Sequence, residues 1–565
     1  MDYKRIILGF GLLVTLYLLL LAWQEDYGQK ARSLTSQPDL PLDTVTTSST
    51  SSAIPQTPSL EGSDGVPDFI PEINEQPHSS PDDQLAIDFD RFVTVSTDVL
   101  NVIIDKVGGD IITVSLPQYP ESIDLPDQPF ILLDPTNDYT AQTGLIGPSG
   151  TDSSLSRPLF RSQLNEYLMD DSGVLSVALD LEQDNGTRII KTFKFSKSNY
   201  LVSITYNVEN FTNQDWTGAI YGQIKRDSKQ PPGSGGNAMM MQPFVGGATR
   251  TEDELYKKLE FDDLKESTFA TRHEGGYMAF VQHYFVSAFV PDSSFEHNYQ
   301  ARKLPNQDTY IFGFTSPLWV VPAGNVDSQS IGFYSGPKDQ YRLKDLAGGL
   351  DLTVDYGFLW WLAQPLFWLL TMIQENISSN WGVAIMLLTL CVKGALYPLS
   401  AAAYRSTAKM RKLQPEMLRL REQFGDDRQK LSQGMMDLYK KAGTNPLGGC
   451  LPILLQMPVF IALYWVLLES VELRQAPFIL WIDDLAAMDP YFVLPILMGV
   501  SMYFVTAMQP EPPDPMQAKI FKWMPIVFTF FFIWFPAGLV LYWLVNNVVS
   551  LLQQWYVTRQ IESGK

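Results

Sequence analysis

The 565-residue chain has only two cysteines, Cys391 and Cys450, and both lie in apolar stretches. This excludes a disulfide framework, so an extracytoplasmic domain would have to be held by its own core. No Gly-x-x-x-x-Gly-Lys-Ser/Thr motif is present, which excludes the usual phosphate-binding loop of nucleotide hydrolases. The four histidines have no metal-ligand spacing. We therefore expect no metal site, no cofactor and no enzymatic activity.

Negative charge is concentrated in one part of the chain. The net charge is −21, yet residues 24–355 alone hold 47 acidic and 23 basic side chains, and the remainder is slightly basic. An acidic, solvated region repels nucleic acid and anionic lipid, which argues against a DNA-binding role for it. Because the two parts of the chain differ in net charge, we expect them to lie in different compartments.

The N-terminus carries Lys4 and Arg5 before an apolar run over 6–23, which is typical of a signal peptide or of an uncleaved anchor. We favour an anchor over 1–23, because its end lacks the small residues that a signal peptidase needs. The two basic residues then keep the N-terminus cytoplasmic and send the acidic region outside. Residues 24–83 are predicted to be a disordered linker, since 28–68 contain no aromatic residue.

A β domain is predicted over 84–345. Val202, Ile204, Tyr206 and Val208 alternate with polar residues, the pattern of a strand with one buried face. Many short strands with turn signals between them favour a large sandwich.

Several apolar segments follow residue 355. The candidate membrane spans are 358–373, 381–400, 447–468, 491–508, 520–535 and 538–555. If the first crossed, the segment 401–445, with ten basic and five acidic residues, would lie outside, against the positive-inside rule. We therefore interpret 356–378 as an interfacial amphipathic helix. The predicted spans are then six: the anchor at 1–23, the helix at 381–400 and four helices within 446–558. A short cytoplasmic tail follows at 559–565.

Lys393 lies inside the predicted 381–400 span, roughly 16 Å from its outer end. A lysine at that depth costs on the order of 2.5–3.5 kcal/mol. One interpretation is a structural lysine whose amine extends to the cytoplasmic interface, about 10 Å away. The other is a hydrated, positively charged groove that Lys393 lines together with Thr389 and Tyr397, one helical turn away on either side.

Other predicted spans contribute further polar residues to this candidate groove, namely Gln456, Ser501, Asn546 and Asn547. Each could equally be a hydrogen bond between two helices. No intramembrane acid is apparent beside Lys393, which suggests that its partner arrives with a substrate.

Residues 401–445 are predicted to form a cytoplasmic helical hairpin with two helices, 404–424 and 427–442, broken at Gly425. Its candidate docking residues are Arg405, Lys409, Arg411, Lys412, Arg419 and Arg421. Basic residues in this place also fit a simpler role as topology determinants.

The segment Asn445–Phe460, NPLGGCLPILLQMPVF, resembles the signature of the YidC, Oxa and Albino family of membrane protein insertases. Five further segments resemble the long Gram-negative form of the family, so that the likeness covers essentially the whole chain: Leu352–Gly357, Gln364–Phe367, Val471–Phe478, Leu494–Gly499 and Phe535–Tyr542.

The resemblance implies a five-helix membrane core around a hydrophilic groove and a periplasmic β-super-sandwich similar to galactose mutarotases. Lys393 stands where the family typically has arginine, which keeps the charge but loses the bidentate fork. Trp543 stands where relatives often have a substrate-contacting tyrosine. The short tail differs from the long basic ribosome-binding tails of some relatives.

The implied function is insertion and folding of proteins in the Gram-negative inner membrane, alone or with the Sec translocon. Expected partners are nascent inner-membrane proteins, the translocon with its accessory subunits, membrane lipids, the ribosome and the signal recognition particle receptor, with no other nucleic acid. Two alternatives are a secondary transporter, for which the sequence lacks an internal repeat, and a membrane-tethered sugar-binding enzyme, suggested only by the β domain.

Overall fold

The computed structural model describes residues 90–562, apart from 154–155, 232–241, 425–427, 444–450 and 510–514. The predicted anchor at 1–23 and linker at 24–83 lie outside the described residues, as do Cys450 and the predicted break at Gly425.

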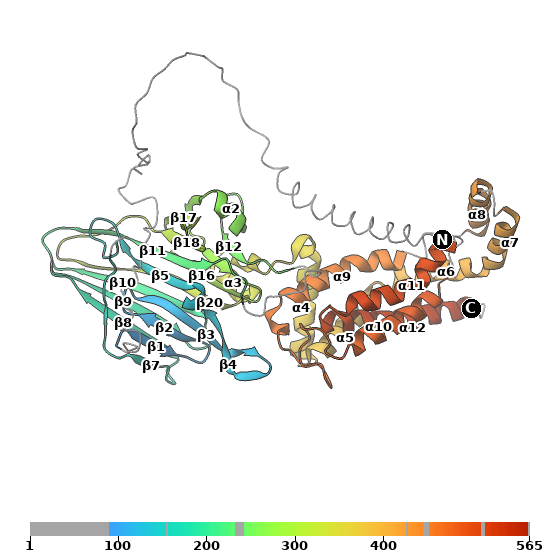
Figure 1. Ribbon diagram of the computed structural model, residues 1–565, viewed down its shortest axis with the longest axis horizontal. Helices are drawn as coiled ribbons and strands as arrows, with labels where there is room; N and C mark the ends of the chain where they lie inside the picture. Colours follow the sequence, from blue (N-terminus) through green and yellow to red (C-terminus); the bar gives the residue numbers. More distant parts are fainter. Residues whose placement is uncertain are drawn as a thin grey trace, which may run out of the picture. The chain divides into compact units, whose positions relative to one another are not determined.

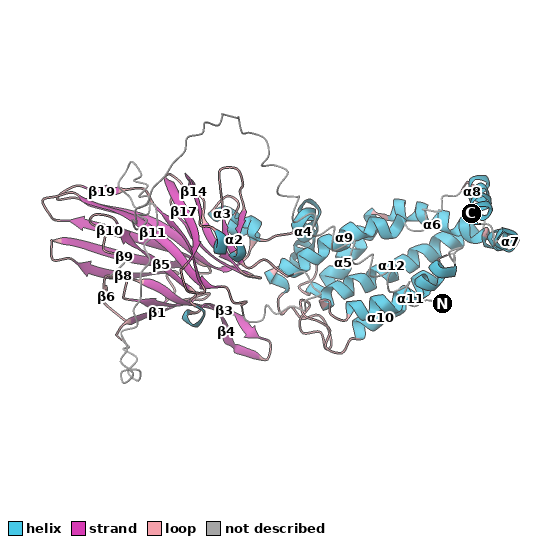
Figure 2. Cartoon of the chain, turned by 45° about the horizontal axis from the view of Figure 1, so that its top comes forward, coloured by secondary structure: helices cyan, strands magenta, loops and turns pink. Residues whose placement is uncertain are grey.

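A β sandwich of two sheets is followed by a helical region, as the sequence predicted (Figure 1; Figure 2). One sheet has the order β14 (Phe269–Glu274), β17 (Glu296–Lys303), β18 (Thr309–Thr315), β11 (Trp216–Asp227), β5 (Thr140–Ile146), β3 (Asp110–Ser122), β2 (Asn101–Asp105), β1 (Phe92–Ser96) and β7 (Glu166–Leu168), with β19 (Trp319–Val321) beside β11 and β4 (Leu125–Leu133) beside β3. The other has the order β13 (Lys257–Leu259), β12 (Gly246–Thr249), β15 (Met278–Val281), β16 (Phe285–Val290), β20 (Val326–Pro337), β10 (Leu201–Asn210), β9 (Thr187–Ser196), β8 (Val174–Glu182) and β6 (Arg161–Ser162).

The alternation predicted for 202–208 is confirmed in β10. Val202, Ile204, Tyr206 and Val208 are at most 1% exposed, and the polar residues between them are half-buried. β10 pairs antiparallel with β9 and β20, so its apolar face joins the core between the sheets. A period of two therefore separates core from surface along this strand.

Helices form the rest of the described chain. They are α2 (Phe261–Glu266), α3 (Gln340–Leu346), α4 (Trp360–Asn376), α5 (Trp381–Ala395), α6 (Tyr397–Lys412), α7 (Gln414–Phe424), α8 (Arg428–Ala442), α9 (Leu451–Glu469), α10 (Val493–Ala507), α11 (Pro515–Phe532) and α12 (Ala537–Glu562). Short 3-10 turns are η2 (Pro135–Asn137), η3 (Leu350–Thr353), η4 (Gly357–Leu359) and η6 (Val471–Leu473). α12 contacts α5, α6, α9 and α10, so it is the central helix of the bundle (Figure 2).

The segment predicted as one span over 381–400 is two helices in the structure. α5 ends at Ala395 and α6 begins at Tyr397, with a bend of 68° between them. Pro398 lies in the first turn of α6, where its missing N–H is tolerated, but it could not continue α5 without losing a hydrogen bond. The structure therefore corrects the continuous helix on which Tyr397 was placed.

By length and composition, no single helix in the described part of the chain suffices to cross a membrane. The bent pair α5 and α6 meets the length and composition of a span only when the two helices are taken together, and Gln456–Glu469 and Val493–Ala507 are shorter apolar helices.

The helix predicted at 356–378 corresponds to α4, which contacts α5 and α9. Ala363, Phe367 and Leu370 are buried on one face, while Trp360 and Trp368 are each 57% exposed on another. An apolar helix with exposed indoles is the pattern expected at the head-group level of a bilayer.

The predicted hairpin helix over 404–424 is also divided, because α6 ends at Lys412 and α7 begins at Gln414. Pro415 disfavours helical geometry at the residue before it and fits best in a first helical turn. α7 and α8 then pack side by side, with Met417 and Met435 buried (Figure 1).

A buried ion pair joins the β domain to the helical region. Lys338 Nζ lies 2.5 Å from Glu469 Oε2, and the two side chains are 1% and 2% exposed. Lys338 follows β20, whereas Glu469 is the last residue of α9. The imidazole of His283 donates through Nε2 to the carbonyl oxygen of Leu468 at 2.7 Å. These contacts attach the end of β20 and the turn between β15 and β16 to the C-terminal end of α9.

Breaking this ion pair from one side should be strongly destabilising. Glu469→Gln leaves the Lys338 charge buried without a counter-charge, which we expect to cost about 3–5 kcal/mol. The double variant Lys338→Met/Glu469→Leu should lose less free energy of unfolding than either of its two single substitutions, because it leaves no unpaired buried charge. Thermal unfolding of the full-length protein in detergent checks this, and additive losses in the double variant would show that the two residues are not coupled.

The His283 contact should make stability depend on pH. Loss of hydration, together with the nearby Lys338 charge, lowers the pKa of His283 to about 3 from 6.5. A depressed histidine pKa stabilises the folded state above pH 6.5, and this contribution is lost as the pH falls from 6.5 towards 3, by up to about 1.4 kcal/mol per unit. Between pH 7 and pH 5 the melting temperature of the wild type should therefore fall more than that of His283→Gln. Equal falls in the melting temperatures of the two proteins would contradict this.

Candidate functional site

Lys393 lies in the last turn of α5, because that helix ends at Ala395. The N-terminal end of α5 is capped by Asn380, whose side chain accepts a hydrogen bond from the Val383 amide at 3.1 Å. A cation in a last turn is favoured by the helix dipole, which gives Lys393 a local stabilisation that a mid-helix position would lack. Its side chain is nevertheless buried, at 5% exposure.

The Lys393 amine points into the bundle. Nζ donates to Gln456 Oε1 of α9 at 2.9 Å and to Ser550 Oγ of α12 at 2.8 Å. Three helices therefore meet at one amine. Both acceptors are neutral, and no ion pair joins Lys393 to any residue that the structure describes.

The polar contacts continue along one face of α12. Gln456 Nε2 donates to the Tyr542 hydroxyl at 3.1 Å and to Asn546 Oδ1. Ser550 Oγ donates to the Asn546 carbonyl oxygen at 2.7 Å. Because Tyr542, Asn546 and Ser550 are four residues apart, they lie on one side of the helix. We call Lys393, Gln456, Tyr542, Asn546 and Ser550 the amine network.

Gln456 and Asn546 were predicted groove residues, and the structure joins both to Lys393. Tyr542 and Ser550 were missed in the sequence analysis. The signal that could have found them is the spacing of four between polar residues in the otherwise apolar 537–551 segment.

Ser501 and Asn547 form a separate pair. Asn547 Nδ2 donates to Ser501 Oγ at 3.0 Å, and Ser501 Oγ donates to the Met498 carbonyl oxygen at 2.6 Å. Asn547 follows Asn546 directly and therefore faces about 100° away around α12. This pair connects α10 to α12 and makes no hydrogen bond to the amine network among the described contacts.

Thr389 and Tyr397 make no hydrogen bond to the Lys393 amine among the described contacts, although Thr389 lies one turn before it on α5. Thr389 is 1% exposed, and its hydroxyl donates to the Ile385 carbonyl oxygen of its own helix at 2.7 Å. Tyr397 lies beyond the bend and packs beside Tyr404 and Val557. The predicted shared face of Lys393 and Tyr397 is wrong, because the helix does not continue between them.

Trp543 lies in an aromatic cluster. Its ring contacts Phe460 edge-on at 4.6 Å between centroids and Phe532 at 5.4 Å. The indole is 9% exposed, and its Nε1 has no hydrogen-bond partner among the residues that the structure describes. A buried indole N–H without an acceptor is costly, so this nitrogen could serve a hydrogen-bonding ligand.

The six predicted docking residues of the hairpin, Arg405, Lys409, Arg411, Lys412, Arg419 and Arg421, are all exposed. They lie on α6 and α7. The described part of the chain contains no cluster of three histidine, cysteine or acidic residues that could hold a metal ion.

Two family models match the chain. The model described as YidC periplasmic domain matches residues 92–369, and the model described as 60Kd inner membrane protein matches residues 372–564. Curated relatives named membrane protein insertase YidC include those of Stutzerimonas stutzeri strain A1501, at 48% identity, and Pseudomonas putida strain GB-1, at 47%. Each comparison covers 100% of this chain and 99% of the relative.

Similar solved structures include an active YidC insertase with its first transmembrane domain resolved, at 18% identity and a TM-score of 0.38, covering 82% of this chain and 92% of that one. A galactose mutarotase-related enzyme from Lactobacillus acidophilus covers 43% of this chain and 97% of its own, at 10% identity and a TM-score of 0.28. At scores this low, neither likeness bears on the fold. Matches to both family models and to full-length relatives establish that this chain belongs to the YidC family of inner-membrane proteins.

Proposed function

We propose that this chain is a membrane protein insertase of the bacterial inner membrane, which inserts integral membrane proteins, helps them to fold and performs no enzymatic reaction. The relatives that match it from end to end carry that activity in their names. For the mechanism, the observation that carries the proposal is the Lys393 amine, which is held inside an apolar bundle by neutral acceptors only.

The amine network leaves a positive charge uncompensated. A lysine at the centre of a bilayer costs on the order of 2.5–3.5 kcal/mol, and two neutral acceptors offset only part of this. A carboxylate makes shorter and stronger hydrogen bonds to an ammonium group than a hydroxyl or an amide oxygen does. An acidic group of an incoming chain can therefore displace Ser550 or Gln456 from the amine.

Apolar surface for the rest of the substrate is available on α10 and α11. Large apolar side chains between 38% and 63% exposed follow these helices: Ile496, Leu497, Val500, Tyr503, Phe504, Ile520, Phe521, Trp523, Ile526, Val527, Phe530 and Phe531. A substrate span can move along this surface into lipid, driven by hydrophobic transfer of about 25 cal/mol per Å² and, for charged tails, by the membrane potential.

The other groove candidates, Thr389, Tyr397, Ser501, Asn547 and Trp543, are proposed as secondary substrate contacts. For Trp543 the free indole N–H supports this role. Ser501 and Asn547 would first have to give up their mutual hydrogen bond.

We further propose six spans, with both termini and the 401–445 hairpin in the cytoplasm and the β domain in the periplasm. The excess of basic residues in the hairpin supports this orientation. Its exposed cations offer a docking surface for the ribosome, the Sec translocon or the signal recognition particle receptor.

Charge at position 393 should matter more than shape. The Lys393→Arg variant should insert substrates normally. Lys393→Ala should slow the insertion of substrates with acidic translocated tails roughly tenfold, as expected for the loss of one charge-assisted hydrogen bond. Lys393→Glu should impair the insertion of these substrates most. Substrates with neutral tails should respond less. Protease protection of two substrates that differ only in tail charge measures this at matched abundance of each variant.

Ser501→Ala tests a proposed secondary contact without changing charge, because it removes a buried polar contact of α12 that lies outside the amine network. It should affect both substrates equally. Equal insertion by the Lys, Ala and Glu forms on both substrates would refute the electrostatic role of Lys393 while leaving the insertase assignment in place.

Most of the β domain should be dispensable for insertion, because the proposed machinery lies after residue 355. Deleting 84–330 removes the sandwich but leaves Lys338 and Glu469 in the chain. Cells that depend on this variant should remain viable. Loss of insertion in a deletant present at normal abundance would contradict the expectation.

A further inference from the structure

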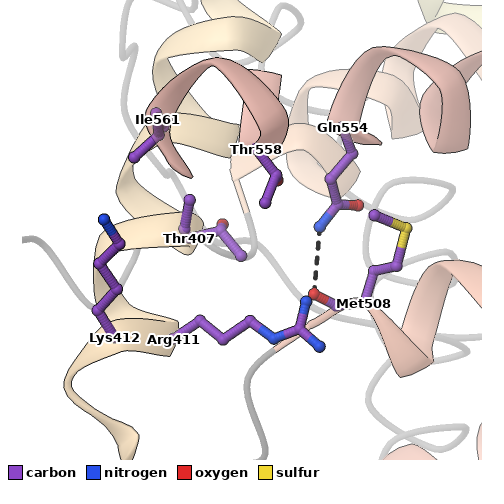
Figure 3. Close-up of a pocket in the computed structure, with 8 residues that line it drawn as sticks. Thr407, Arg411, Lys412, Met508, Gln554, Thr558 and Ile561 are labelled. Atoms are coloured by element: carbon purple, nitrogen blue, oxygen red, sulfur yellow. Dashed lines mark hydrogen bonds between the residues drawn. The ribbon is translucent and has the colours of Figure 1, made fainter. Parts of the chain in front are cut away.

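A polar cavity lies between α6, α10 and α12, beyond the amine network along α12. It has a volume of ≈ 240 Å³ and is lined by Thr407, Ala408, Arg411, Lys412, Met508, Gln554, Thr558 and Ile561. Figure 3 shows the Arg411 side chain extending towards Met508 and Gln554, with Lys412 on the opposite side of Thr407. Two exposed cations therefore lie at the rim of this partly open cavity, on opposite sides of Thr407.

Among the described residues, no carboxylate compensates the charge of this cavity. None of its eight lining residues is acidic, and no ion pair joins Arg411 or Lys412 to a described residue. Gln554 is already engaged, since its Nε2 donates to the Met508 carbonyl oxygen at 3.3 Å. Thr407 likewise donates to the Ala403 carbonyl oxygen at 3.1 Å. The guanidinium, the ammonium and the Thr558 hydroxyl remain as donors, a set that suits the oxygens of one anion.

Exposed aromatic residues surround the cavity on the same helices. Trp555 and Tyr556 of α12 are 54% and 51% exposed, and the Arg559 guanidinium lies 5.3 Å from the Trp555 ring centroid. On α10, Tyr503 and Phe504 are 59% and 54% exposed, one turn before the lining residue Met508. Exposed indoles and phenols are characteristic of the head-group level in proteins of the inner membrane. The cavity therefore opens where lipid head groups would lie.

We propose that this cavity binds the phosphodiester of an anionic glycerophospholipid. Arg411 and Lys412 hold the phosphate oxygens, with Thr558 as a third donor, and the acyl chains lie against Tyr503 and Phe504. Basic pockets between membrane helices on the cytoplasmic side are suited to anionic head groups. A carboxylate of a protein partner would use the same cations but would leave the neighbouring apolar surface of α10 uncovered.

The test is lipid binding to the purified full-length protein in detergent, followed by native mass spectrometry. Phosphatidylglycerol and phosphatidylcholine with identical acyl chains are titrated separately. The wild type should retain one phosphatidylglycerol in preference to phosphatidylcholine. Arg411→Gln/Lys412→Gln should bind it at least about tenfold more weakly, as expected for loss of charge-assisted hydrogen bonds.

Arg405→Gln/Lys409→Gln is the matched control, because it removes the same charge from the exposed part of α6 without changing the cavity lining. It should keep phosphatidylglycerol affinity within about twofold of wild type. Thr558→Leu, which reduces the cavity without changing charge, should weaken binding as well. Unchanged thermal melting of each variant shows that folding is intact.

Three results would overturn the proposal. Equal losses in the cavity and control variants would show that net charge alone holds the lipid. Equal retention of both lipids by the wild type would remove the selectivity for an anionic head group. Displacement of phosphatidylglycerol by millimolar inorganic phosphate would identify a site for the free anion and not for a lipid.

Discussion

The arrangement of the helical region depends on the need of one buried ammonium group for acceptors. Lys393 is 5% exposed, and Gln456 of α9 and Ser550 of α12 lie at hydrogen-bond distance from its amine. That requirement sets the rotation of both helices relative to α5. Satisfying the amine with neutral oxygens, and not with a carboxylate, leaves the charge available to a ligand that enters the bundle.

α12 links the amine network to the proposed lipid cavity. Tyr542, Asn546, Ser550 and Gln554 are spaced by four residues, and each has a hydrogen-bonded contact with a neighbouring helix or with α12 itself. The helix is 26 residues long, so one rigid element carries both sites. The chain bends by 68° between α5 and α6. Arg411 of α6 lines the same cavity as Gln554, the last of these four residues of α12. A substrate bound at the amine and a lipid bound at the cavity would therefore contact a single helix.

The acidic residues at the end of α9 and in the segment after it have specific partners. In the structure Glu469 is paired with Lys338, and Asp489 accepts hydrogen bonds from the Trp481 indole and the Leu494 amide. These contacts stabilise the attachment of the β domain and the start of α10. Acidic residues in this region thus define local structure by their hydrogen bonds.

The sequence by itself determined the family, the alternation of β10 and the set of polar residues in the apolar segments, because motifs and periodicity are local properties of a chain. It did not determine where helices end, since Pro398 and Pro415 permit several continuations and packing selects one. Nor did it pair the polar residues. Ser550 lies 157 residues from Lys393, and Glu469 lies 131 residues from Lys338. Which acceptor meets which donor follows from the rotation and crossing of whole helices, and only the tertiary structure sets those.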